Sequence, residues 1–471
     1  MTTGEPQCNP VLLATTGDPR AEFRALLALA IPVVISEIGW MAMSIVDTIM
    51  VGKLGPVAIG AVAIGSFAYY CPALFGIGLL LGLDTLVSQA HGGRDFDECH
   101  RWLAQAVYLA AAYTPVCMLL SLGIAHLFPF WGVNAAVGAA GAQYLNVLNW
   151  STLPLLLYAA ARRYLQGVAR VAPVTFALLS ANLVNWAGNW LLISGHLGFP
   201  AMGVRGSALS TCVARLYMAA VLFYAAWQYE RKRGHPLFAH WPGPEILRLR
   251  RLLQLGLPAA GQLIMEVGAF GAATVMAARL APEALAAHQI VLNTASLTYM
   301  VPLGVSAATA VSVGHAVGAG NAAKARRVGW MGVAAGAGFM ALAAIAFLVI
   351  PGPIIRVYSA DSGILHLGVP LFAMAGVFQI FDGLQSVSTG ALRGLGQTRL
   401  PMYANMVGYW CFGLPLGYAL CFVKGWGVVG LWLGLSLALI FIAIVILNKW
   451  AKQSRALLSR VIKSEGERAP S

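Results

Sequence analysis

The second half of this chain repeats the first half at an almost constant offset of 226 residues. Ile31-Pro32 returns as Leu257-Pro258, and Gly92-Gly93 returns as Gly318-Ala319. Both copies consist of long apolar segments. Duplications of this kind are typical of secondary transporters, which bind their substrates near the interface of two repeats. The repeat therefore predicts two similar helical bundles and favours a transport function.

The composition indicates a membrane environment. Apolar residues make up 59% of the 471 residues and charged residues 10%, and a soluble protein could not bury that much apolar surface. A helix needs about 20 apolar residues to cross the hydrocarbon region of a bilayer. The sequence predicts an all-α membrane protein with twelve such helices, at residues 27–51, 57–85, 102–124, 140–161, 173–194, 203–227, 252–278, 283–310, 328–350, 365–390, 401–422 and 428–449.

The net charge of +13 is unevenly distributed between the predicted loops. If both termini lie in the cytoplasm, 24 of the 30 Lys and Arg residues fall on that side of the membrane. The positive-inside rule selects this orientation. The basic residues are therefore expected to face anionic lipid headgroups, and nucleic acid is not expected as a partner.

Six predicted spans in each copy mean that both copies enter the membrane in the same direction, so the repeat is parallel. A polar, proline-containing stretch separates the copies and indicates a linker. The predicted divisions are a cytoplasmic N-terminal tail at 1–26, an N-lobe at 27–227, a cytoplasmic linker at 228–251, a C-lobe at 252–450 and a cytoplasmic C-terminal tail at 451–471.

Ionisable residues inside the predicted spans are the main functional signal. Each costs about 2.5 to 3.5 kcal/mol at the centre of a membrane helix, so it must face protein or water. A structural ion pair or hydrogen bond is the alternative role for each of them. These residues are Glu37, Asp47, Asp84, Arg215, Glu266 and Asp382.

Amide and histidine side chains accompany these acids at helical spacing. Gln379 precedes Asp382 by three residues, and Gln262 precedes Glu266 by four, so each pair shares a helical face. Buried amides need hydrogen-bond partners, which favours a polar cavity over lipid. Further polar residues in the spans are Asn182, Asn185, Asn189, His288, Gln289 and Asn293.

Several motifs resemble those of the multidrug and toxic compound extrusion (MATE) transporters, of the NorM-like branch. They cover nearly the whole chain and include Val46-Asp47-Thr48-Ile49-Met50-Val51-Gly52, Gln89-Ala90-x-Gly92, Ala287-His288-Gln289, Val313-Gly314 and Arg393-Gly394. The resemblance implies two six-helix lobes that form a V-shaped central cavity. It also implies export of organic, often cationic compounds in exchange for inward Na⁺ or H⁺.

The same resemblance assigns residues to the coupling ion. Asp47 matches the acidic position of the family's first-lobe ion site, and Asn185 and Asn189 match its fifth-helix ligands, which makes these three residues candidate Na⁺ ligands. Ser207 falls where some members have a hydroxyl group. Glu266 and Asp382 match the acidic positions of the second lobe.

The predicted activity is therefore that of a cation-coupled antiporter in the inner (plasma) membrane, without an enzymatic reaction or a cofactor. A carboxylate in an apolar cavity can hold a proton, or it can join amide and hydroxyl oxygens around a hard cation, so Na⁺ and H⁺ both remain open. The expected substrates are small organic cations. We expect the chain to function as a monomer in the lipid bilayer.

Walls that bind flat organic cations should be rich in aromatic, thioether and amide groups. Packing against lipid or within the core is the alternative role for each of these side chains. The candidate cavity residues are Trp40, Met41, Tyr69, Gln262, Met265, His288, Gln289, Asn293, Tyr299, Gln379 and Phe381.

Three other classes fit parts of this pattern. A flippase for a lipid or a lipid-linked precursor would have more spans and a basic central cavity. A major facilitator has twelve spans, but the order of residues in Gly92-Gly93-Arg94-Asp95 does not fit its loop signature. A membrane-embedded enzyme would need acids at metal-binding spacing or a nucleophile beside a histidine, and neither arrangement is found in the sequence.

Overall fold

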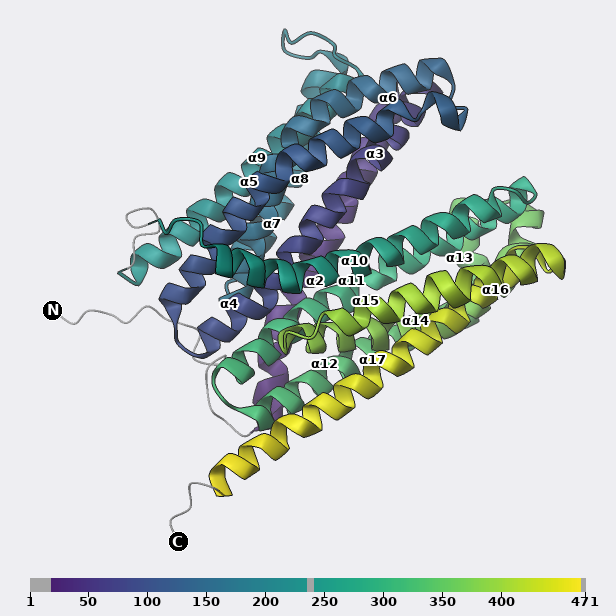
Figure 1. Cartoon of the computed structure of the whole chain (residues 1–471). Helices are drawn as coiled ribbons and strands as arrows, with labels where there is room; N and C mark the ends of the chain where they lie inside the picture. The colour runs from purple at the N-terminus through teal and green to yellow at the C-terminus, as the bar shows by residue number, and fades with distance from the viewer. Residues whose placement is uncertain (1–17, 235–240, 467–471) are drawn as a thin grey trace. The chain divides into compact units, whose positions relative to one another are not determined.

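The computed structural model describes residues 18–234 and 241–466. This part of the chain contains helices and no β-strand (Figure 1). Its first half forms α2 (Pro19–Gly52), α3 (Pro56–Leu80), α4 (Gly82–Gly92), α5 (Phe96–His126), α6 (Ala135–Leu148), α7 (Thr152–Gly167), α8 (Ala172–Ser194) and α9 (Val204–Lys232). Its second half forms α10 (Ile246–Ala277), α11 (Pro282–Gly318), α12 (Ala322–Val349), α13 (Pro351–Tyr358), α14 (Ser362–Gly394), α15 (Arg399–Asn405), α16 (Leu414–Tyr418) and α17 (Gly427–Gly466).

The predicted all-α class and its spans are confirmed. Among the described residues, eleven helical segments are long and apolar enough to cross a membrane, and each contains most of one predicted span. The remaining predicted span, 140–161, corresponds to α6 and α7, which a short 3-10 turn, η2 (Asn149–Ser151), separates. Two hydroxyl groups bond back to carbonyls at this turn, Ser151 to Leu148 O at 2.6 Å and Thr152 to Asn149 O at 2.7 Å. The break therefore comes from local polar groups within an apolar segment.

A second predicted span, 401–422, is also irregular. It consists of α15, the π-helical η3 (Met406–Gly413), α16 and the π-helical η4 (Ala419–Val423). π-turns of this kind occur frequently at functional sites in α-helices. Hydropathy alone predicts the length of this segment but not its winding.

The described chain divides into two compact units. The first unit includes Ile35–His91 and the described residues from Asp95 to Ala260, and the second includes the described residues up to Val34, Gly92–Arg94 and the described residues from Gly261 onward. The chain changes unit within α2 after Val34 and within α10 after Ala260, positions separated by the repeat offset of 226 residues. The two copies of the repeat are therefore divided at equivalent points.

The boundaries predicted for the two lobes, the linker and the tails remain predictions. Parts of three predicted segments lie outside the described residues. They are 1–17 of the N-terminal tail, 235–240 of the linker and 467–471 of the C-terminal tail. Helical structure extends into both predicted tails, because α2 begins at Pro19 and α17 continues to Gly466.

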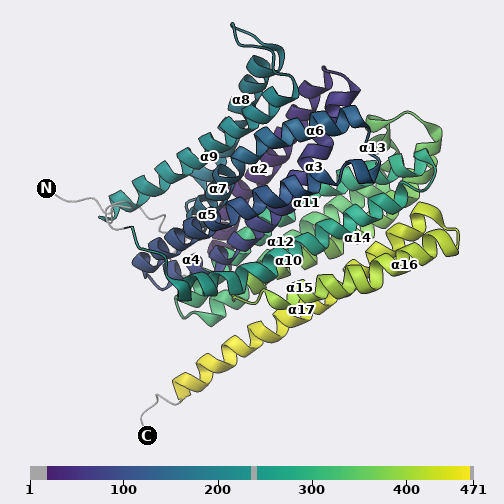
Figure 2. The ribbon, with the colours of Figure 1, turned by 45° about the horizontal axis from the view of Figure 1, so that its top comes forward.

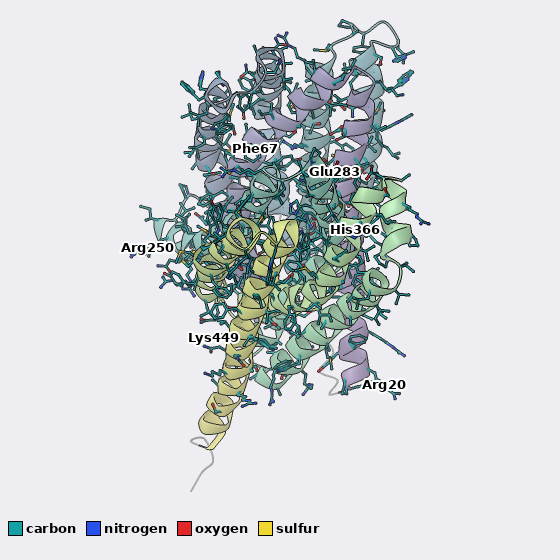
Figure 3. The ribbon with its side chains drawn as sticks, turned by 90° about the vertical axis from the view of Figure 1, so that its right-hand side faces the viewer. Arg20, Phe67, Arg250, Glu283, His366 and Lys449 are labelled. Carbon is teal, nitrogen blue, oxygen red and sulfur yellow. The ribbon has the colours of Figure 1, made fainter. Side chains whose placement is uncertain are left out.

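Within the second unit, α11, α12, α14 and α17 run side by side (Figures 1 and 2). Consecutive helices run in opposite directions, so their N-termini alternate between the two ends of the bundle. Figure 3 shows Arg20 and Lys449 toward one end of this unit, and Glu283 and His366 toward the other. The first unit packs α8 along α9, α7 against α9, and α3 against α5 and α6.

Glycine allows α3 and α10 to approach closely within the first unit. A Cβ atom added to Gly256 would lie 2.1 Å from the carbonyl oxygen of Leu79, and one added to Gly78 would lie 2.5 Å from Cα of Ala260. Contacts between backbone atoms cannot be relieved by a change of rotamer. Small residues at helix crossings are the usual means of packing helices in a membrane.

We expect Gly256→Ala to lower the free energy of unfolding of the purified protein by about 1 to 3 kcal/mol, because the added methyl group forces α3 and α10 apart. Gly271→Ala is the matched control on the same helix, since nothing lies within 4 Å of its added Cβ and alanine favours the helix. Thermal unfolding in detergent compares the two. Equal melting temperatures for both variants would contradict this account of the packing.

Candidate functional site

Asp47 lies on α2 at the wall of a cavity within the first unit. This first-unit cavity has a volume of about 160 Å³. The side chains that line it come from α2, α3, α6 and α9 and combine one acid and one base with aromatic and apolar groups. They are Trp40, Met43, Ser44, Asp47, Thr48, Val51, Ile59, Val62, Ala63, Ser66, Tyr70, Tyr144, Thr211 and Arg215.

The carboxylate of Asp47 is held by groups from α8 and α9. Asn189 Nδ2 donates to Asp47 Oδ1 at 2.5 Å and contacts Asn185 Oδ1 at 3.2 Å. Thr211 Oγ1 donates to Asp47 Oδ2 at 3.4 Å. Asn185 and Asn189 face the same side of α8 because they are four residues apart. The structure therefore brings together three residues predicted for the ion site.

Two buried side-chain oxygen atoms on α8 and α9 lack a hydrogen-bond partner. Asn189 Oδ1 and Ser207 Oγ are buried, and neither has a partner among the described residues. Asn185 and Ser207 are both fully buried. Unpartnered buried oxygens are rare because they lose the hydrogen bonds that water would provide. Asn189 therefore has a spare acceptor on the amide that contacts the Asp47 carboxylate, and Ser207 has one on α9.

Asn182, the third asparagine of α8, has a different role. Its Nδ2 donates to Gly39 O at 3.1 Å and to Leu178 O at 2.9 Å. These bonds tie α8 to α2 through a backbone carbonyl. Asn182 thus supports the helix pair that carries Asp47 and Asn189.

The predicted aromatic walls of the first unit are only partly found at the cavity. Trp40 lines it and stacks on Tyr158 with ring centroids 6.0 Å apart. Tyr69 is fully buried, and its neighbour Tyr70 lines the cavity instead. Met41 is half-buried and is not among the lining residues.

The second unit brings its two predicted acids together. Glu266 on α10 has Gln385, Gln262 and Tyr299 as its polar neighbours, and Asp382 on α14 is close enough to Glu266 to interact with its charge. Asp382 is 7% exposed and Gln385 is 1% exposed. This cluster of two carboxyl groups, two amides and a phenol is referred to below as the second-unit acid cluster.

His288 is occupied by structural hydrogen bonds. The indole N–H of Trp432 donates to His288 Nδ1 at 3.0 Å, and His288 Nε2 lies 3.0 Å from Thr274 Oγ1. Because an indole N–H only donates, Nδ1 accepts and the ring proton sits on Nε2. His288 is fully buried, so the structure places it in the packing between α10, α11 and α17 and not at a cavity wall.

The other predicted cavity residues of the second unit are dispersed. Gln379 is buried and donates to Thr298, and Phe381 packs against the apolar core. The carbonyl of Met265 accepts a hydrogen bond from Trp410 at 2.9 Å. Gln289 is half-buried and Asn293 is exposed.

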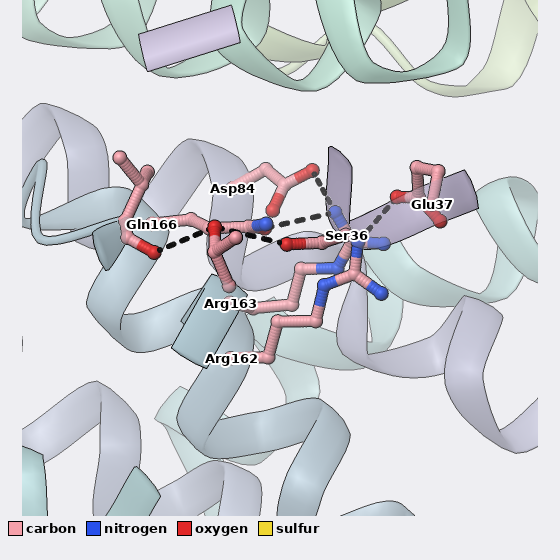
Figure 4. Close-up of polar contacts among 8 residues, drawn as sticks. Ser36, Glu37, Asp84, Arg162, Arg163 and Gln166 are labelled. Atoms are coloured by element: carbon pink, nitrogen blue, oxygen red, sulfur yellow. Dashed lines mark hydrogen bonds and ion pairs between the residues drawn. The ribbon is translucent and has the colours of Figure 1, made fainter. Parts of the chain in front are cut away.

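Four charged side chains form two ion pairs inside the first unit (Figure 4). Arg162 on α7 pairs with Glu37 on α2. Arg163 Nη1 lies 3.5 Å from Asp84 Oδ2 on α4 and 3.4 Å from Gln166 Oε1. Arg162 and Glu37 are 7% and 9% exposed. Glu37 and Asp84 are thus structural ion-pair partners, the alternative that the sequence left open.

Three important residues were missed or undervalued from the sequence. Arg162 lies one residue beyond the predicted end of its span, so its burial was not foreseen. Thr211 lies one turn after Ser207, and that spacing on a polar helical face was a usable signal. Tyr409 is fully buried near Glu266 and Asp382, and nothing in its apolar π-helical segment marks it.

Comparison with known proteins identifies the family to which this chain belongs. The MatE family model matches residues 32–191 and 258–419, one match in each copy of the repeat. The chain belongs to the MatE family. Members of this family are membrane transporters and not enzymes, so this MatE chain is a multi-pass transporter.

Relatives of this MatE chain match over almost their full length. It is 36% identical over 444 residues to the "Probable multidrug resistance protein NorM" of Mesorhizobium japonicum, covering 93% of this chain and 95% of the relative. A relative with the same name in Xylella fastidiosa is 33% identical and covers 90% of this chain and 91% of its own length. A crystal structure of MATE in the bent conformation shares the fold at a TM-score of 0.86 and 18% identity, covering 97% and 99% of the two chains.

The ion pair between Glu37 and Arg162 in this MatE protein can be tested with a double-mutant cycle. We expect Glu37→Met and Arg162→Met each to destabilise the fold by about 3 to 5 kcal/mol, because each leaves one buried charge without its partner. The double variant should be far more stable than the sum of the two losses predicts. Thermal unfolding of the four proteins in detergent measures the coupling, and additive losses would refute a structural pair.

Proposed function

We propose that this chain is an antiporter that exports hydrophobic, mostly cationic organic compounds, including drugs, in exchange for inward Na⁺ and H⁺. The name of the Mesorhizobium relative supports multidrug efflux. The observation that carries the proposal is Asp47 at the wall of a partly aromatic cavity, held by amide and hydroxyl groups. Aromatic faces attract organic cations, and the carboxylate supplies the opposite charge.

The first-unit site favours Na⁺. Its available ligands are carboxylate, amide and hydroxyl oxygens, which hard cations prefer. Asn189 Nδ2 faces Asp47, while Asn189 Oδ1 has no partner. Rotation of the amide by about 180° would therefore turn its oxygen toward a cation bound at Asp47. Among the described residues no group of three or more His, Cys, Asp or Glu side chains is suited to a metal ion, which disfavours a transition metal.

The second-unit acid cluster favours a proton. Two carboxylates that interact in a buried site repel each other, and one shared proton removes the repulsion. Glu266 and Asp382 are such a pair, with Gln262 and Gln385 available to bond either form. The proton would leave when water enters the site.

Exchange follows from competition for the same negative charge. A bound ion shifts the balance between inward-open and outward-open states only by the difference in its affinity for them. A cation that occupies Asp47 disfavours an organic cation at the same carboxylate. Alternating access then couples the entry of one to the release of the other.

The distribution of charge supports an inner (plasma) membrane location with both termini in the cytoplasm. Arg20 and Lys449 lie at the same end of the second unit, and the alternating helix directions bring Lys324, Arg327 and Arg399 to that end as well. Basic residues mark the cytoplasmic side of bacterial membrane proteins. The proposed unit of function is the monomer, because both candidate ion sites are formed within one chain.

Reconstitution into proteoliposomes tests the two ion sites separately. Efflux of a cationic dye is measured under a Na⁺ gradient alone and under a pH gradient alone. We expect Asp47→Asn to lower Na⁺ affinity by roughly 30- to 150-fold, as loss of a charged ligand worth about 2 to 3 kcal/mol implies, and to abolish Na⁺-driven efflux. Glu266→Gln and Asp382→Asn should abolish the pH-driven component.

Glu283→Gln is the control, because it removes an exposed carboxylate of the second unit. It should leave both components unchanged. If the wild-type protein exported the dye neither under the Na⁺ gradient nor under the pH gradient, the antiport proposal would be refuted. Unchanged Na⁺-driven efflux by Asp47→Asn would refute the first-unit site, and unchanged pH-driven efflux by both second-unit variants would refute the acid cluster.

A further inference from the structure

A buried arginine lines the same cavity as Asp47. Arg215 on α9 is 2% exposed and contributes to the cavity wall. Its guanidinium carbon lies 4.7 Å from the ring centroid of Tyr69, and its Nη1 donates to Ser151 Oγ at 2.7 Å. The aromatic ring and the η2 turn between α6 and α7 therefore fix the position of this cation.

Arg215 lacks a fixed counterion in the structure. No carboxylate oxygen of the described residues lies within ion-pair distance of its guanidinium group. Its bond to Ser151 uses one of five N–H groups. Asp47 on the same cavity wall interacts with the charge of Arg215 without a hydrogen bond to it, so the remaining N–H groups are available to an acceptor that enters the cavity.

The chemistry of the guanidinium group restricts that acceptor. Arginine presents its N–H groups as a planar fork that matches the two oxygens of a carboxylate. Tyr69 covers one face of the plane, which leaves the edge of the fork for hydrogen bonding. Asp47 lies on the wall of the same cavity, with Trp40, Tyr70 and Tyr144 among the other lining residues.

We propose that Arg215 binds a carboxylate of the transported compound, and that the first-unit cavity therefore prefers aromatic zwitterions, with the amine at Asp47 and the carboxylate at Arg215. This inference rests on the proposed function. Opposite charges on the walls of one cavity complement a compound that carries both charges. A simple organic cation is attracted by Asp47 but repelled by Arg215.

The charge of the exported compound determines how much net charge each exchange moves across the membrane. Exchange of one Na⁺ for one monovalent organic cation moves no net charge, whereas exchange for a zwitterion moves one positive charge inward. Each 100 mV then changes the attainable concentration ratio by roughly 50-fold. Export of a zwitterion should respond to membrane voltage even when export of the matched cation does not.

The test compares a fluorescent aromatic amino acid that has a basic amine with its methyl ester, which keeps the amine but lacks the carboxylate. Binding to the purified protein is measured by fluorescence titration. We expect the wild-type protein to bind the zwitterion at least 10-fold more tightly than the ester. Arg215→Gln should abolish this preference by weakening zwitterion binding, while ester binding stays equal or improves.

Arg205→Gln is the matched control, because Arg205 is an exposed arginine on the same helix. It should retain the wild-type preference. The wild-type comparison needs no variant, so it decides the question even if Arg215→Gln fails to fold. Equal binding of zwitterion and ester by the wild-type protein would overturn the inference, as would a preference that survives in folded Arg215→Gln.

Transport separates this inference from the proposed function. If proteoliposomes export the ester under a Na⁺ gradient but show no preference for the zwitterion, the antiport proposal stands and the role of Arg215 falls. If they export neither compound nor the cationic dye, the proposed function fails, and the inference fails with it. Voltage-dependent export of the zwitterion alone supports both.

Discussion

A charged or polar group within the span of a membrane helix must find its partner in the protein or in an internal cavity, because lipid offers none. This constraint sorts the buried polar residues of the chain into two kinds. Glu37 and Arg162 satisfy each other and hold α2 against α7. Asp47 and Arg215 have neutral partners and face a cavity. Residues of the second kind can exchange partners, which a transporter requires.

The helices were largely predictable because hydropathy determines where a chain can cross lipid. Each predicted span overlaps a helix, yet the interruptions were not foreseen. The η2 turn depends on which carbonyls Ser151 and Thr152 bond, and the π-helical segments η3 and η4 lie against α17. These interruptions involve hydrogen-bond geometry and neighbouring helices. The mean hydropathy of a 20-residue segment contains no information about either.

The candidate site was predictable where the residue type itself was unusual in a membrane helix. Asp47, Asn185 and Asn189 could be selected on that basis, and the structure joins them. His288 met the same criterion but pairs with Trp432, 144 residues away in the sequence. Likewise, Glu37 pairs with Arg162 across 125 residues. A polar residue can be recognised from sequence, but whether its partner is a protein group or a cavity depends on these distant contacts.

The repeat duplicates the fold without duplicating the chemistry. At the offset of 226 residues, Asp47 corresponds to Ala273 and Glu266 corresponds to Trp40. Ala273 is fully buried in the apolar core, so the second unit has no room for a copy of the Asp47 site. One unit therefore holds its acid among amides and hydroxyls, and the other holds two acids beside each other. Under the proposed function, two sites that differ in their number of acids would bind different ions at the same time and give a single chain access to two gradients.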